Sequence, residues 1–323
     1  MLEVFLSSWV LLQLLKMRYS LIVFFSFIAF GALAQIPAKK YKWKHLGPFT
    51  RSESTVDSGK WTAVGQGWIE DIVLKEDAIY AGSIKGGLFC TENGGKKWNK
   101  IDSDTIQMGT LCLLAVDETL YRGTGVTHYG QDWGVGFLKS INGGKTWEST
   151  NLTFTARDKK PIWSVSASNS GKNMVACTPH DIFLSTDYGE NWNTVYSGKD
   201  LDFRRVLFDP NNERRFWACG STVLETKNLG VDWTDHFDKV TKGLSERDIK
   251  SISRIDPALD SNNGSRILLF FGVRYGAFVV ESIDKGDNWN IIYQNKYVRR
   301  ADIHHTEIAI APDNPDFIIL RNL

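Results

Sequence analysis

The sequence predicts an all-β fold, a β-propeller built from four-stranded blades, and three observations point to it. One short pattern occurs five times: a hydroxyl residue, any residue, Asp or Asn, any residue, Gly, two further residues and Trp. The tryptophans of successive copies are 49, 45, 41 and 56 residues apart, close to the length of one propeller blade. The chain also has 12 Trp and 28 Gly among its 323 residues, which suits many short strands joined by tight turns.

Each copy of the pattern is expected to close the turn before the last strand of its blade. An Asp or Asn side chain accepts hydrogen bonds from nearby backbone N–H groups, and Gly adopts the positive φ that other residues avoid. The Trp then begins the outgoing strand and buries its ring between neighbouring sheets. The positions assigned this structural role are Asn93 with Trp98, Asn142 with Trp147, Asp187 with Trp192, Asn228 with Trp233, and Asp284 with Trp289. The pattern is a folding device that says little about a ligand.

Strands are expected between the copies. The predicted strands are 69–74, 78–81 and 88–91 in the first blade, 163–167, 174–178 and 182–185 in the third, and 205–208, 216–219 and 223–226 in the fourth. Residues 307–311 and 316–320 predict two strands of a partial sixth blade, and the chain stops before a sixth pattern. Because an open edge invites aggregation, either residues 41–49 supply a closing strand or the propeller, residues 68–323, is incomplete at its C-terminus. We expect the second.

Residues 1–34 are predicted to be a signal region. From Met17 a basic residue precedes an apolar run that ends in Ala32, Leu33 and Ala34, as in a secretory signal peptide. The alternative is a membrane anchor, but each apolar stretch is shorter than the roughly 20 residues that a bilayer requires. We therefore assign the signal peptide to residues 17–34 and an N-terminal segment to residues 35–67, and expect a secreted or periplasmic protein without a membrane span after cleavage.

Composition excludes several partners and cofactors. With 38 basic and 37 acidic residues the net charge is +1, so no overall field favours nucleic acid. The four cysteines lack the short spacings of a disulfide framework or zinc site; they are Cys90, Cys112, Cys177 and Cys219. We expect them to be buried thiols in strands. The alternative is a single disulfide, whose two cysteines the sequence does not identify. His304 and His305 would point to opposite faces of a strand, so no metal site is expected, and no cofactor.

The five patterns resemble the Asp-box, or BNR, repeats of a propeller superfamily that includes sialidases, xyloglucan-cleaving glucanases, the sortilin ectodomain and a photosystem assembly factor. The segments WKHLGPF (43–49) and GVGFLKSINGGKTW (134–147) are most similar to secreted bacterial sortilin-like propellers. The resemblance implies the fold but no single activity, because members with the same repeats bind peptides, cut glycans or support assembly.

Two enzyme activities can be tested against the sequence. Sialidases carry an Arg-Ile-Pro type motif, and no Arg-x-Pro occurs here. Xyloglucanases carry an Asp in a first-blade motif; the matching run here is residues 80–87, in which Ile84 stands at the position of that Asp. Glycoside hydrolysis generally needs two carboxylates, and only Glu70, Asp71, Asp132 and Asp181 are placed to be considered.

A ligand is expected on the face opposite the Asp-box turns. The ligand-binding candidates are Trp133, His128, Asp132, His180, Arg204, Arg274 and Tyr275, and further residues of that face are Lys85, Trp68, Trp163, Arg205 and the two adjacent histidines. Arg grips carboxylates, and aromatic rings stack on sugars or peptide side chains. Trp133 is favoured because its loop, 124–136, is the longest of its kind. The alternative for each charged loop residue is that its side chain is only solvated. The alternative for Trp133 is that its ring covers the adjacent blade. The sequence therefore predicts a binding or scaffold module for a peptide or glycan, with a glycoside hydrolase as the alternative.

Overall fold

The computed structural model describes residues 69–84, 86–101, 109–125, 134–155, 157–158, 160–262, 264–274, 276–295, 308–312 and 314–320. The predicted signal region and N-terminal segment, with the closing strand proposed at 41–49, lie outside the described residues. None of the helices within these ranges is long and apolar enough to cross a membrane.

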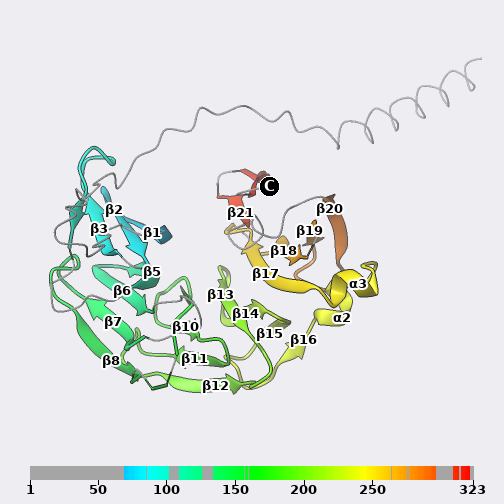
Figure 1. Cartoon of the computed structure of the whole chain (residues 1–323), viewed down its shortest axis with the longest axis horizontal. Coiled ribbons are helices and arrows are strands. Elements are labelled where there is room, and N and C mark those ends of the chain that lie inside the picture. Colours follow the sequence, from blue (N-terminus) through cyan, green and yellow to red (C-terminus); the bar gives the residue numbers. More distant parts are fainter. Residues whose placement is uncertain are drawn as a thin grey trace, which may run out of the picture. The chain divides into compact units, whose positions relative to one another are not determined.

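The described chain forms five four-stranded antiparallel sheets and one two-stranded sheet (Figure 1). These are blade 1, β1 (Ile69–Lys75), β2 (Ala78–Ser83), β3 (Gly87–Thr91) and β4 (Asn99–Lys100); blade 2, β5 (Thr110–Val116), β6 (Thr119–Thr124), β7 (Gly136–Ser140) and β8 (Glu148–Thr153); blade 3, β9 (Ser164–Ala167), β10 (Met174–Cys177), β11 (Asp181–Ser185) and β12 (Asn193–Ser197); blade 4, β13 (Phe203–Asp209), β14 (Asn212–Gly220), β15 (Val223–Thr226) and β16 (Thr234–Asp235); blade 5, β17 (Ile252–Leu259), β18 (Ile267–Val273), β19 (Gly276–Ser282) and β20 (Asn290–Asn295); and the sixth sheet, β21 (Ile308–Ala311) and β22 (Asn314–Leu320). The predicted all-β propeller, with five full blades and a partial sixth, is confirmed.

Two short helices between blades 4 and 5 were not predicted from the sequence. Helix α2 spans Phe237–Val240 and helix α3 spans Glu246–Ile249. The hydroxyl of Ser245 caps α3 by accepting a hydrogen bond from the backbone N–H of Asp248 at 3.2 Å. Val240 is buried in the core between the two blades. This insertion accounts for the longest spacing of the repeat, the 56 residues between Trp233 and Trp289.

All five repeat turns share one set of hydrogen bonds. In blade 3, the Ser185 hydroxyl accepts from the Gly189 N–H at 2.9 Å and donates to the Asp187 carboxylate at 2.7 Å. The same carboxylate accepts from the Asn191 N–H at 2.9 Å. Equivalent bonds occur in the other four turns. The residue before the pattern's Gly is also left-handed in every copy, with φ from 60° to 70° at Gly94, Gly143, Tyr188, Leu229 and Lys285.

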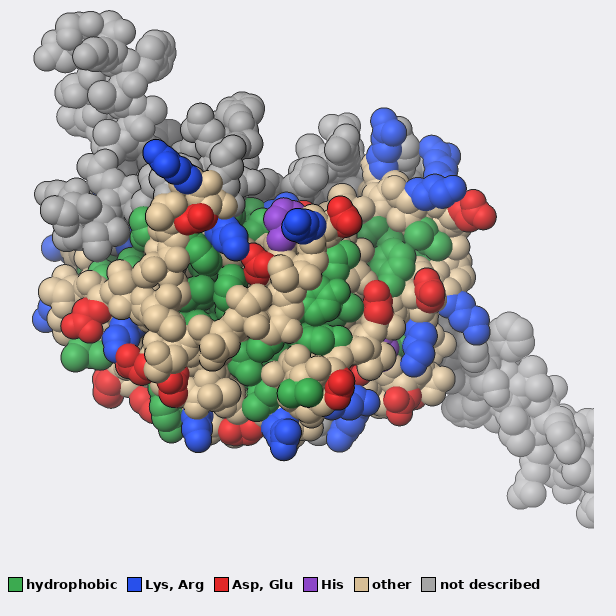
Figure 2. Space-filling model, turned by 90° about the horizontal axis from the view of Figure 1, so that it is seen from below, with side chains coloured by type: hydrophobic (Ala, Val, Ile, Leu, Met, Phe, Trp, Pro, Cys, Tyr) green, Lys and Arg blue, Asp and Glu red, His purple; other side chains and the backbone are tan. Residues whose placement is uncertain are grey.

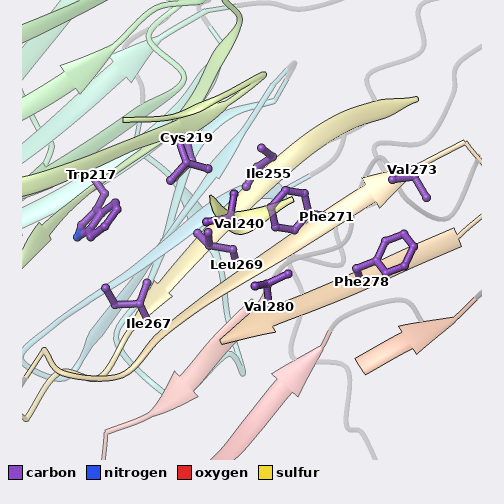
Figure 3. Close-up of a cluster of buried hydrophobic side chains, with 11 residues drawn as sticks. Trp217, Cys219, Val240, Ile255, Ile267, Leu269, Phe271, Val273, Phe278 and Val280 are labelled. Atoms are coloured by element: carbon purple, nitrogen blue, oxygen red, sulfur yellow. The ribbon is translucent and has the colours of Figure 1, made fainter. Parts of the chain in front are cut away.

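In blades 2 to 5, the Trp of the pattern packs against the blade before it. The Trp192 ring meets Phe137 of blade 2 edge-on, with ring centroids 5.1 Å apart, and its indole N–H donates to the Gly189 carbonyl. Trp289 packs in the same way on Trp217 of blade 4, at 6.1 Å. Figure 3 shows the core beside this contact, where side chains of β14, α2 and blade 5 converge.

Successive blades also touch through their first strands, β1, β5, β9, β13, β17 and β21. Asp71 accepts a hydrogen bond from the Leu113 N–H at 2.7 Å, and Ser166 accepts one from the Phe208 N–H at 3.0 Å. Each of these bonds spans 42 residues, one blade. The repeat turns lie at one end of the strands, here called the turn face; the loops between second and third strands and between blades lie at the other end, the loop face.

The four cysteines are free thiols, buried in strands β3, β5, β10 and β14. This confirms the expectation of buried thiols. Burial raises the pKa of the Cys177 thiol to about 12, so it is protonated at neutral pH.

Candidate functional site

On the loop face, blades 3 and 4 bring three segments of the chain together: residues 160–163, 178–181 and 201–204. Backbone hydrogen bonds hold them, from the Trp163 N–H to the Cys177 carbonyl at 2.9 Å and from the Phe203 N–H to the Pro179 carbonyl at 2.7 Å. A β-bulge between Phe203 and Arg205 lies at the start of β13. Such bulges re-aim side chains beside functional sites, and this one leaves Arg204 unpaired in the register.

The Arg204 guanidinium stacks on the indole of Trp163, its central carbon 4.3 Å from the ring centroid. Its Nε and Nη2 both donate to the same oxygen of Asp202, at 3.0 and 2.7 Å. Because guanidinium has five N–H donors, this pairing occupies one edge of the group. The Arg204 side chain is one-third exposed. The stack therefore presents a cation of fixed orientation at the surface.

Two polar atoms beside this stack are buried without a hydrogen-bond partner among the described residues, Nε1 of Trp163 and Oδ1 of Asp202. Leaving a buried polar group unsatisfied costs about 1–3 kcal/mol. Native proteins retain few such groups, and each one needs a physical explanation.

Asp181 forms a second charged contact in the cluster. It receives hydrogen bonds from the Lys160 ammonium at 2.8 Å and from the Ser197 hydroxyl at 2.6 Å. Burial alone would raise the pKa of this carboxyl, but the bonds from Lys160 and Ser197 outweigh burial and lower the pKa below its ordinary value. Asp181 is therefore an ionised acceptor at neutral pH and cannot serve as a general acid.

Some of the ligand-binding candidates predicted from sequence lie among the described residues, and the others do not. His180 lies in the cluster, exposed, with Nδ1 2.7 Å from the Leu201 carbonyl, which requires the ring proton on Nδ1. Arg274 is exposed in the β18–β19 loop of blade 5. Trp133, His128, Asp132, Tyr275, Lys85, Trp68, His304 and His305 lie outside the described residues, and their assignments stay predictions.

Lys160 and Asp202 are cluster residues that the sequence analysis missed. Lys160 precedes Pro161 at the entry to blade 3, and Asp202 lies two residues before the arginine with which it pairs. The only signal was their position just before predicted first strands, where the chain crosses between blades on the loop face.

A further charged contact lies on the first strands of blades 4 and 5. Asp256 is buried on β17, and its carboxylate contacts Arg205 of β13 at 3.5 Å and Arg254 of its own strand. On the coloured part of the face drawn in Figure 2, both basic and acidic side chains are present. Within the described ranges no three His, Cys, Asp or Glu side chains gather as a metal site would require.

Fold and cluster together define a β-propeller with an arginine–tryptophan stack on its loop face. No family model matches the sequence, and no curated protein matches it. Among solved structures, the chain is similar to YCF48 bound to D1 peptide, with 14% identity, 79% of this chain and 75% of that chain covered, and a TM-score of 0.52. It is also similar to the GH74 xyloglucanase from Xanthomonas campestris, with 13% identity, 80% and 51% covered, and a TM-score of 0.50. The chain thus spans about half the length of that enzyme. These similarities show the propeller fold alone.

Proposed function

We propose that this chain is a secreted binding module that captures a peptide or glycan carrying a carboxylate on its loop face. The observation that carries the proposal is the Arg204–Trp163 stack, at 4.3 Å. Asp202 engages one edge of the guanidinium through a single oxygen, and the other edge can pair with a ligand carboxylate in the two-bond geometry that arginine favours.

The surroundings of Arg204 suit recognition of a polar ligand. Trp163 holds the guanidinium plane in place, so little side-chain entropy remains to be lost on binding. The exposed His180 lies on the same loop face, as a further hydrogen-bonding group. An acidic sugar or a peptide carboxylate fits this combination of a fixed cation and neighbouring polar atoms.

A glycoside hydrolase is the competing function, and the two carboxylates of the cluster, Asp181 and Asp202, favour binding over it. Hydrolysis requires a protonated carboxylic acid with a raised pKa beside a second carboxylate. In the cluster, Asp181 is ion-paired with a lowered pKa, and Asp202 pairs with Arg204. Asp132, a candidate from sequence, lies outside the described residues.

We also propose that the chain is a secreted Asp-box propeller of the sortilin-like type. This assignment is supported by the signal-peptide pattern at residues 17–34 and by the shared hydrogen bonds of the five repeat turns. A YCF48 propeller of similar fold binds a D1 peptide, so peptide capture is compatible with this architecture.

The test is an array of acidic and neutral glycans and of peptides with free or amidated C-termini, probed with the full chain and with Arg204→Ala. Arg214→Ala is the matched control, because Arg214 is an exposed arginine at the turn-face end of β14. We expect acidic ligands to bind the wild type and the control, and binding to Arg204→Ala to weaken about tenfold or more, as for loss of one charge-assisted pair. Cleavage of a bound glycan, or equal binding of acidic ligands by the wild type and Arg204→Ala, would refute the proposal.

A further inference from the structure

The turn face carries a cavity between blades 2 and 3 that the proposed function does not use. Its volume is about 180 Å³, below the ~300–1,000 Å³ typical of sites for drug-sized ligands, so it has room for about one side chain. Blade 2 supplies Val116, Asp117, Thr119, Tyr121, Lys139 and Ile141, and blade 3 supplies Tyr188 and Glu190. We call it the interblade pocket.

Tyr188 is the unusual residue of this pocket. It occupies the left-handed position of its repeat turn, with φ 60°, where the turns of blades 1 and 2 have Gly94 and Gly143. A non-glycine residue in this conformation costs roughly 1–2 kcal/mol. Of its two non-glycine counterparts, Leu229 packs against the core and Lys285 is exposed, while Tyr188 remains 48% exposed. Among the five repeat turns, Tyr188 is the residue that brings an aromatic ring to this position and leaves it accessible.

The backbone around Tyr188 is held from both sides. Its N–H donates to the Lys172 carbonyl at 2.9 Å, and its own carbonyl accepts from the Tyr121 hydroxyl of blade 2 at 2.7 Å. Tyr188 therefore extends from a turn whose backbone is fixed, and it lines the pocket together with Ile141, which is 72% exposed. Together they form a pre-organised aromatic and aliphatic wall.

The charges of the interblade pocket select a cation. The lining contains two carboxylates, Asp117 and Glu190, and one basic residue, Lys139, whose ammonium is already paired with Glu190 at 2.5 Å. The lining thus carries a net charge of minus one. Consistent with this, the pKa of the Tyr121 phenol is raised, mainly by burial and then by the negative charge of Glu190. An anionic ligand would meet two carboxylates and no unpaired cation.

We propose that the interblade pocket binds one arginine side chain of a partner polypeptide. A guanidinium can stack on the exposed Tyr188 ring while donating to the Asp117 or Glu190 carboxylate, and its aliphatic stem can lie against Ile141. The site lies on the opposite face from Arg204, so the chain would hold an acidic ligand on one face and a basic segment on the other.

The probe is acetyl-Gly-Arg-Gly-amide, observed by saturation-transfer NMR with the full chain, beside the Glu and Leu versions of the same peptide. We expect the Arg peptide to bind with a Kd on the order of 1 mM. The Glu and Leu peptides should bind much more weakly. Tyr188→Gly should retain the turn, because sister turns use glycine there, and should weaken binding about tenfold. Asp117→Asn should also weaken it. Val231→Ser, at an exposed apolar residue of the blade 4 turn, is the control and should bind like the wild type.

Three outcomes would overturn this proposal: no transfer to the Arg peptide, equal transfer to the Glu or Leu peptide, or unchanged affinity in Tyr188→Gly. A melting temperature for Tyr188→Gly at or above that of the wild type is expected, because the substitution relieves strain, and it separates lost binding from lost folding. Arg204→Ala should leave binding of the Arg peptide unchanged, so that failure here is distinct from failure of the loop-face proposal.

Discussion

Replacing Arg215 with Met tests the network that joins blades 4 and 5. The Arg215 guanidinium donates to Glu225 at 2.6 Å, to Asp209 at 3.1 Å and to the carbonyl of Lys285, in the blade 5 repeat turn, at 2.5 Å. Its side chain is 4% exposed, and that of Glu225 is 2% exposed. The substitution keeps most of the aliphatic volume and removes the charge.

The expected loss of unfolding free energy is about 3 kcal/mol. Removing one partner of a buried ion pair costs roughly 3–5 kcal/mol, because the other charge stays buried. The value falls at the lower end because Glu225 keeps a bond from His236 at 2.8 Å. Burial raises the pKa of Glu225, yet His236 and Arg215 lower it below its ordinary value of 4.5. The network therefore stabilises the fold above about pH 4.5, and this contribution is lost as pH falls further.

Urea unfolding followed by tryptophan fluorescence measures this loss, and the melting temperature should fall by about 6–12 °C. The matched control is Lys227→Met, because Lys227 contacts the same Glu225 oxygen at 3.8 Å but is 65% exposed. That surface pair should contribute under ~1 kcal/mol. Equal losses in the two variants, or a loss below about 1 kcal/mol for Arg215→Met, would refute the argument that burial decides the strength of the contact.

Two further predictions concern the repeat turns and the contacts between blades. Bonds from Asn288 and Ser282 lower the pKa of Asp284 from 3.8 to about 2, so its contribution is present above pH 3.8 and lost as pH falls through 2. In acid titrations of unfolding, the stability advantage of the wild type over Asp284→Asn should shrink as pH falls from 3.8 and should be gone well below pH 2; an advantage that stays constant to below pH 2 would contradict this. Asp71→Ala leaves the Leu113 N–H without its acceptor and should cost about 1–3 kcal/mol by urea unfolding, whereas Asp71→Asn should cost less; equal costs would exclude the hydrogen bond as the cause.

Most of the fold could be predicted because its signal is local and repeated. A single turn chemistry recurs, and the strand at residues 223–226 was predicted with the bounds that the structure shows. The predicted ends of strands were less accurate where hydrogen-bonded pairing extends a strand beyond its apolar residues. Strand β14, for example, begins at Asn212 and not at Phe216 as predicted. Helices α2 and α3 were missed because each has four residues and depends on tertiary packing, such as that of Val240, rather than on periodicity.

The candidate site could be predicted only in part, because it forms between segments that are distant in sequence. Trp163 and Arg204 were both assigned to the loop face, but their stacking follows from the bulge in β13 and the packing of blade 3 on blade 4. Lys160 and Asp202 carry no motif, and their partners are known only from the coordinates. Tyr188 was hidden inside the repeat, since the pattern allows any residue at that position.

Calorimetric titration with the strongest acidic ligand from the array measures directly whether Arg204 on the loop face binds that ligand. Wild type, Arg204→Ala and Arg214→Ala would be titrated at low and high salt. We expect saturable binding by the wild type and Arg214→Ala, with an affinity that falls as salt rises, and at least about tenfold weaker binding by Arg204→Ala. Equal affinity in all three proteins would contradict this expectation.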